Sequence, residues 1–116
     1  KKAFLKSKLD NGQKQILTQT IRGDLEIIFY QIFQDKEINK EDLNNKNLFH
    51  LKVIKNMVFA KHNYKFDTKY YQAFFNQYYF YSQKKDSRTK EVNHLLTETD
   101  KYNLKLIKEE IERRKE

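Results

Sequence analysis

Residues 55–66, KNMVFAKHNYKF, constrain the fold most because they join a helix end, a turn and a short aromatic segment. The apolar residues up to Ala60 follow helical spacing, and Asn63 stands where the backbone must turn. Asn tolerates the left-handed backbone conformation that commonly follows the end of a helix. The stretch therefore predicts an amphipathic helix that stops at Asn63 and continues as extended chain through Tyr64 and Phe66.

Helical spacing of apolar residues recurs along the rest of the chain, and no strand pattern competes with it. The expected elements are a helix over about 13–34, a charged linker over 35–47, helices over 48–62 and 68–77, a polar loop over 82–90 and a last helix from Thr97. We therefore expect an all-α fold, a small bundle of about four helices with a short extended aromatic segment and a polar loop.

Spacing also predicts which side chains face the core. The inward positions are Phe49, Leu51, Val53, Ile54, Met57, Val58 and Ala60 in the second helix, Tyr71, Phe74, Phe75 and Tyr78 in the third, and Leu104, Ile107 and Ile111 in the last. Asp67 or Thr68 is a suitable N-cap for the third helix. Thr97 is a suitable N-cap for the last, and Asp100 completes a capping box with Thr97. Glu109 with Arg113 and Glu110 with Arg114 form favourable pairs four residues apart.

The chain divides into an N-terminal helical extension with a linker, residues 1–47, and a helical module, residues 48–116. Because the sequence begins at Lys1 rather than Met, we expect an excised domain or a processed chain. No apolar run approaches the roughly 18 residues that a membrane span needs. There is no cysteine, which excludes disulfides and thiolate chemistry.

The formal net charge is +8, which raises nucleic acid and anionic surfaces as partners. The excess is mostly Lys rather than Arg, and Lys lacks the planar fork that grips phosphate with two bonds. A solvated basic surface explains the charge at least as well, and we consider nucleic acid the less favoured partner.

Residues from about 48 to 112 resemble the YARHG domain family. The matching positions are Asn56 after Lys55, then Phe59-Ala60-Lys61-His62-Asn63, the aromatic segment 64–66, Phe74-Phe75, Phe80-Tyr81, Leu96-Thr97 and Asn103-Leu104. Relative to the family motif this sequence has Phe for Tyr, Lys for Arg, Asn for Gly and Phe for Trp. The resemblance implies a small bacterial domain that acts outside the cytoplasm, in the periplasm or at the cell surface, and that has no established activity.

His62 is the sharpest candidate for chemistry. Beside Lys61 and near Asp67, it could act as a general base or a pH-sensing group. The competing interpretation, which we favour, is a histidine at a helix end that caps carbonyl groups or bonds Tyr64. Asn56 and Asn103 lie near apolar helix faces, and a structural role in tying helices or the intervening loop together is favoured over a catalytic amide.

The aromatic cluster between residues 64 and 81 is too large to be entirely core. Helical spacing leaves Tyr70, Tyr79 and Tyr81 as surface rings, which could stack on sugars, peptides or bases. The alternative is a rim that packs the polar loop. With Lys61, His62 and Tyr64, these three rings are the candidate ligand-binding residues.

Basic residues of the polar loop form a further candidate patch. Lys84, Lys85 and Arg88, together with Lys61, Lys65 and Lys69, would suit an anionic glycan or single-stranded nucleic acid, although a solvated loop is the simpler interpretation. His50, His62 and His94 follow no metal-ligand spacing. We expect no cofactor, no metal site and no enzymatic activity.

Three functions remain open. The leading hypothesis is a non-catalytic binding or accessory module of a bacterial cell-envelope protein, which recognises peptidoglycan or another envelope component. The second is a protein–protein or structural module that docks through its N-terminal helix. The third is nucleic-acid binding, motivated by the net charge alone.

Overall fold

A computed structural model describes residues 23–115, and this part of the chain is all-α with no strand. Its α-helices are α3 (Gly23–Phe33), α4 (Leu48–Ala60), α5 (Lys69–Phe75), α6 (Tyr79–Ser82) and α7 (Glu98–Lys115). Short 3-10 helices are η1 (Lys40–Leu43), η2 (Lys85–Ser87) and η3 (Asn93–Leu95). The prediction of a small bundle of about four helices is confirmed. None of the described helices is long and apolar enough to cross a bilayer.

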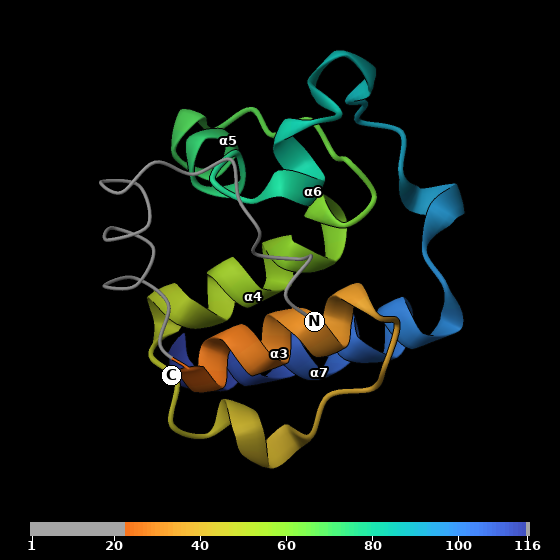
Figure 1. Cartoon of the computed structure of the whole chain (residues 1–116). Coiled ribbons are helices and arrows are strands. Elements are labelled where there is room, and N and C mark those ends of the chain that lie inside the picture. The colour runs from red at the N-terminus through yellow and green to blue at the C-terminus, as the bar shows by residue number, and fades with distance from the viewer. Residues whose placement is uncertain (1–22, 116) are drawn as a thin grey trace.

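The three long helices form the body of the domain (Figure 1). Helices α3, α4 and α7 run alongside one another, with α5 and α6 on one side and the chain of residues 34–47 on the other. Helix α3 contributes Ile28, Phe29 and Ile32, which are all at most 2% exposed. The first part of the predicted helix, residues 13–22, lies outside the described residues.

Residues 35–47 connect α3 to α4, and they are anchored to the core at two positions. Ile38 and Leu43 are buried in the core at 2% and 0% exposure. The backbone N–H of Ile38 donates to Oδ1 of Asn103 at 3.0 Å, and Nδ2 of Asn103 donates to the carbonyl of Lys36 at 3.0 Å. The high density of charged residues and Asn obscures these two apolar anchors in the sequence.

Arg114 fastens the end of the same segment to the last turn of α7. Its guanidinium donates to the carbonyl oxygens of Leu43 (3.1 Å), Asn44 (2.6 Å) and Lys46, and its Nε donates to Glu110 at 2.7 Å. Arg113 also pairs with Glu110, rather than with Glu109 as the four-residue spacing predicted. Glu110 is 3% exposed, so both guanidinium groups compensate a buried charge.

Helix α4 lies between the other long helices and packs chiefly on α7. Leu51, Ile54, Met57 and Val58 are completely buried, as the spacing predicted. Phe49 is the exception, since its ring is 43% exposed. Its position in the helix turns it toward α5 rather than into the core, and the prediction of an inward Phe49 is wrong.

Helix α4 ends as predicted. Asn63 adopts φ of 62°, and the chain then runs extended through Tyr64 and Lys65. Lys65 N–H donates to the carbonyl of Thr89 at 2.8 Å, and Thr89 N–H donates to the carbonyl of Asn63 at 3.2 Å. The Asn63 side chain also donates to the carbonyl of Lys84 and to Oγ of Ser87, both at 3.0 Å. One residue therefore ends the helix and holds the polar loop.

Tyr81 is not a surface ring, which corrects another prediction. It is 0% exposed, its hydroxyl donates to the carbonyl of Tyr64 at 2.5 Å, and the Arg88 guanidinium lies 3.7 Å from its ring centre. The reason is the one-turn helix α6, which rotates Tyr78 and Tyr81 together into the core. The sequence had indicated no helix at this position.

The double role of Asn63 gives a testable prediction. Asn63→Gly keeps the left-handed backbone and removes the two loop hydrogen bonds, so it should lower the free energy of unfolding by about 1 kcal/mol. Asn63→Ala loses the same bonds and also disfavours positive φ, which should cost about 1 kcal/mol more. Urea unfolding monitored by circular dichroism measures both. Equal destabilisation by the two variants would contradict a left-handed requirement at this position.

Candidate functional site

The most concentrated group of charges surrounds the buried carboxylate of Asp100, in the first turn of α7. Asp100 is 0% exposed and accepts from Nζ of Lys61 at 2.8 Å, from Nε2 of His62 at 2.6 Å and from the N–H of Thr97 at 3.0 Å. An ionised carboxylate only accepts hydrogen bonds, so His62 carries a proton on Nε2. Thr97 Oγ1 accepts from the N–H of Asp100, which completes the predicted capping box.

Asp35 joins this group from the end of α3. Its Oδ1 accepts from Oγ1 of Thr97 at 2.6 Å and from Nζ of Lys61 at 3.3 Å. Asp35 adopts φ of 63°, so α3 stops in the same left-handed conformation as α4. The ends of α3 and α4 and the start of α7 therefore meet at one cluster of ion pairs.

The surroundings of Asp100 act on its pKa in opposite directions. Burial alone would raise the pKa, but hydrogen bonds from Lys61, His62 and Thr97, with the charge of Lys61, leave it below the ordinary value for an aspartate. The carboxylate is therefore ionised at neutral pH. The side chains of Lys61 and His62 are only 8% and 16% exposed, so the cluster is mostly closed to a ligand.

His62 has none of the three partners expected from the sequence, which were Asp67, Tyr64 and a helix carbonyl. Asp67 pairs with Lys90 instead, and the His62 ring contacts Asp100 rather than Tyr64 or a helix carbonyl. Asp100 had been recognised only as a capping residue of its own helix. A buried carboxylate needs cationic partners, and this requirement is the signal that could have indicated the cluster. Because 38 residues separate Asp100 from His62, the sequence did not show that these two residues pair.

The predicted ligand-binding residues do not form one site. Lys61 and His62 are in the Asp100 cluster, while the half-buried Tyr64 packs between Phe59 and Phe66, with ring centres 5.8 Å and 4.9 Å away. Tyr79 is half-buried at the start of α6, and Tyr81 is core. Only Tyr70 is well exposed, at 46%.

Several predicted motif residues have structural positions. Asn103 is buried and holds residues 36–38, as described above, whereas Asn56 is half-buried on the outer side of α4. Ala60 and Phe75 are buried in the core, and Phe59 and Phe80 pack at its edge.

Tyr70 forms an exposed aromatic pair with Phe49, although helical spacing predicts that Phe49 faces the core. The two ring centres lie 5.9 Å apart in an edge-to-face arrangement that joins α4 to α5. His50 lies beside Phe49 at 5.6 Å, and Lys52 and Lys69 are exposed on the same two helices. Burial and the neighbouring Tyr71 raise the pKa of Tyr70, so its hydroxyl remains a hydrogen-bond donor at neutral pH.

The basic loop patch expected from the sequence is only partly available. Lys61 is paired with Asp35 and Asp100. Arg88 donates to Asn76 and to the carbonyl of Tyr81 at 3.0 Å while its guanidinium covers the Tyr81 ring. Lys65, Lys69, Lys84 and Lys85 are exposed.

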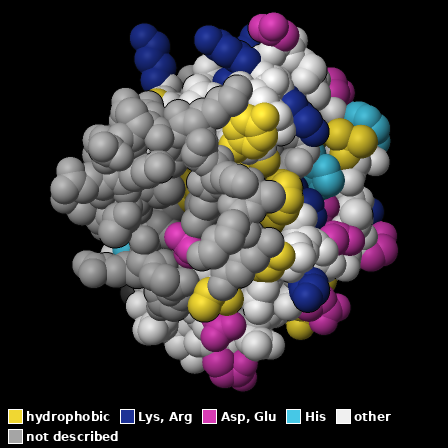
Figure 2. All heavy atoms as spheres, in the orientation of Figure 1, with side chains coloured by type: hydrophobic (Ala, Val, Ile, Leu, Met, Phe, Trp, Pro, Cys, Tyr) yellow, Lys and Arg dark blue, Asp and Glu magenta, His cyan; other side chains and the backbone are white. Residues whose placement is uncertain are grey.

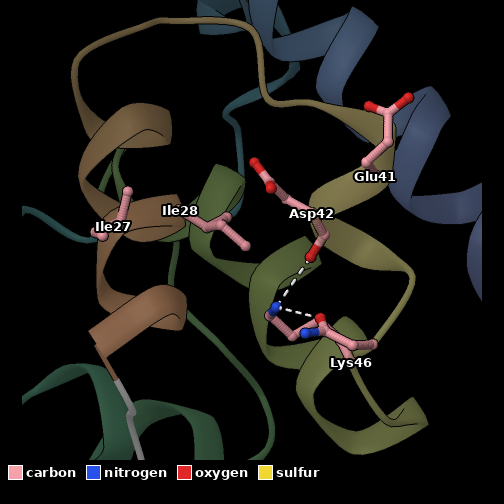
Figure 3. Close-up of a pocket in the computed structure, with 6 residues that line it drawn as sticks. Ile27, Ile28, Glu41, Asp42 and Lys46 are labelled. Carbon is pink, nitrogen blue, oxygen red and sulfur yellow. Dashed lines mark hydrogen bonds between the residues drawn. The ribbon is translucent and has the colours of Figure 1, made fainter.

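Two pockets of about 260 Å³ each are lined by both polar and apolar side chains. One is lined by Phe33, Ala60, Lys61, Asn63, Phe80, Gln83 and Lys84. The other lies between α3 and η1, where Lys46 points across the opening and donates to the Asp42 carbonyl at 2.9 Å and to Asn45 Oδ1 at 2.7 Å (Figure 3). Within residues 23–115, no three His, Cys, Asp or Glu side chains gather as a metal site.

A comparison with models of protein families identifies the family of this domain. The family model of the YARHG domain matches residues 26–112. This chain belongs to the YARHG family. The match begins at residue 26 rather than about 48, and α3 and residues 34–47 thus lie largely inside the YARHG domain. No curated protein and no solved structure matches the chain.

The residues that carry the YARHG motif build the joint between α4 and α7. Lys61 and His62 hold the Asp100 carboxylate, and Asn63 provides the left-handed stop at the position where the family motif has Gly. The geometry assigns these motif residues to the packing of the domain.

Substituting Asp100 should test how much the domain depends on this joint. Asp100→Asn leaves the largely buried Lys61 with less opposing charge, and we expect it to lower the free energy of unfolding by about 3 kcal/mol. Since the folded pKa of Asp100 is depressed, its contribution is present above the unfolded pKa of about 3.9 and is lost as pH falls through the lower folded pKa.

Chemical unfolding between pH 2.5 and 7 measures both effects. The wild type should lose stability below about pH 4, and Asp100→Asn should lose less over that interval. Glu110, whose pKa is also depressed by Arg113 and Arg114 against the effect of burial, should account for part of the remaining acid sensitivity. Parallel stability–pH curves for wild type and variant would contradict this assignment.

Proposed function

We propose that this YARHG domain is a non-catalytic binding module of a bacterial cell-envelope protein, acting in the periplasm or at the cell surface, and that it recognises cell-wall glycan. The observation that carries the proposal is the exposed aromatic pair, Phe49 and Tyr70. Its rings are 43% and 46% exposed, and each comes from a different helix of a rigid core. Flat rings of this kind stack on the apolar faces of sugars, and a tyrosine hydroxyl adds a directional hydrogen bond.

The state of the acid–base groups supports a non-catalytic role. Within residues 23–115, His62 and Asp100 are the histidine and carboxylate that contact each other, but each is engaged by the other and Asp100 has no exposure to solvent. A general base needs to reach the proton of a bound substrate. The pair instead joins the end of α4 to the start of α7, so its hydrogen bond stabilises the fold.

Docking of a protein through the N-terminal helix is the alternative. The apolar stripe that suggested it is occupied from residue 28 onward, because Ile28, Phe29 and Ile32 are buried in the core of the same chain. Ile27 at 52% and Phe33 at 38% exposure remain on the outside of α3. The aromatic pair is therefore the better supported recognition surface.

On the face seen in Figure 2, the charge pattern gives nucleic-acid binding less support. Acidic and basic side chains are interspersed over the visible described surface of that face rather than gathered in one basic stripe. Proteins that bind nucleic acid typically concentrate Lys and Arg on one face.

Co-sedimentation with purified peptidoglycan sacculi at physiological salt tests the proposal. Phe49→Ala and Tyr70→Ala should each reduce retention about tenfold, because each removes one stacking ring. Tyr102→Ala is the matched control, since Tyr102 is 44% exposed on α7 and lies outside the pair. It should leave retention unchanged, and all three variants should keep the wild-type melting temperature within a few degrees.

Retention of both ring variants at the wild-type level would remove the aromatic pair from the proposal. No retention of the wild type at either low or physiological salt would overturn glycan recognition itself. Loss of retention in Tyr102→Ala as well would indicate a general surface effect.

A further inference from the structure

We infer that the glycan is a phosphodiester-linked wall polymer, and that its phosphates are held by a lysine cluster on α4 and α7 beside the aromatic pair. The lysine cluster consists of Lys52, Lys55, Lys108 and Lys115. This inference rests on the proposed function, because it names the class of glycan that the same face recognises.

The outer side of α4 connects the rings to the first two lysines. Phe49, Lys52 and Lys55 follow one another at three-residue intervals, so they lie in sequence along one side of the helix. Lys52 is exposed and Lys55 is half-buried, while Leu51 and Ile54 face the core. Phe49 and these two lysines therefore lie on the outer side of α4, with Phe49 turned toward Tyr70 of α5.

Helix α7 supplies the other two lysines. It runs antiparallel to α4, because His62 at the end of α4 contacts Asp100 at the start of α7, whereas Arg114 in its last turn reaches the carbonyl of Lys46 just before α4. Lys108 and Lys115 are exposed and seven residues apart, which places them on the same side of α7 about 10 Å from each other.

Lys55 lies within electrostatic reach of the other three lysines, one on its own helix and two on α7. Partial burial lowers the pKa of Lys55, and the charges of Lys108, Lys52 and Lys115 lower it further. An anion bound near these lysines would reduce the repulsion between their like charges.

Acidic neighbours neutralise the cluster only in part. Lys115 lies 3.4 Å from Glu112, whose side chain is 72% exposed, and Glu109 is exposed next to Lys108. Exposed ion pairs of this type contribute only about 0–1 kcal/mol, so an incoming phosphate can compete for the same ammonium group.

The arrangement fits a polymer whose charges lie in its backbone. A lysine ammonium binds phosphate as a compact point charge, without the planar geometry that an arginine fork imposes. A phosphodiester-linked glycopolymer presents phosphates in line and sugar units between them. The lysine cluster would take the phosphates while Phe49 and Tyr70 stack on a sugar.

The test compares sacculi that retain their phosphodiester-linked polymers with the same sacculi after hydrofluoric acid extraction, which cleaves those linkages. A quadruple variant changes Lys52, Lys55, Lys108 and Lys115 to Gln. The matched control changes Lys36, Lys40, Lys65 and Lys85 to Gln, since these lysines are also exposed and the net charge falls equally.

Wild-type affinity should fall about tenfold or more after extraction, and the cluster variant should show that loss already on untreated sacculi. The control should stay within about threefold of the wild type on both. Equal wild-type binding to both sacculi that still requires Phe49 and Tyr70 would overturn this inference and leave glycan recognition standing.

Two other outcomes would also overturn it. Equal losses in both quadruple variants would mean that the net charge acts alone. Full competition by single-stranded DNA of equal phosphate number would mean that phosphate, and not the glycan, is recognised. Absence of wild-type binding to either preparation would remove the proposed function together with the inference.

Discussion

The buried carboxylate of Asp100 is the constraint on which the rest of the fold depends. A carboxylate with no exposure requires cationic and N–H partners, and here they come from Lys61, His62 and Thr97. Asp35 extends the cluster to the end of α3. The relative positions of the three long helices are thus fixed at one end by electrostatics, while apolar packing fills the space between them.

Sequence patterns correctly predicted the features that depend on residues close together in the chain. The stop at Asn63 and the capping box at Thr97 depend on residues within one helical turn, and both are present. The pairing of His62 with Asp100 spans 38 residues, so no local pattern could reveal it. The domain was therefore predictable as an all-α bundle, but the joint that orders its helices was not.

The exposure of individual aromatic side chains was also not predictable from local patterns. Periodicity alone placed Phe49 inside and Tyr81 outside, and a short helix reversed each assignment: α5 beside Phe49, and α6, to which Tyr81 itself belongs. Helix α6 turns Tyr81 into the core, and α5 brings Tyr70 against a Phe49 that stays on the surface. Periodicity states which residues share a helix side, but the partner element decides whether that side is covered.

Arg114 has a consequence for where this domain ends. The family match stops at residue 112, yet the guanidinium two residues later is bonded to three carbonyl groups of the chain before α4 and to the buried Glu110. A fragment cut at the homology boundary would leave these acceptors and one buried carboxylate without their main partner. The folded domain therefore extends beyond the end of the family match, and a stable fragment must include the final turn of α7.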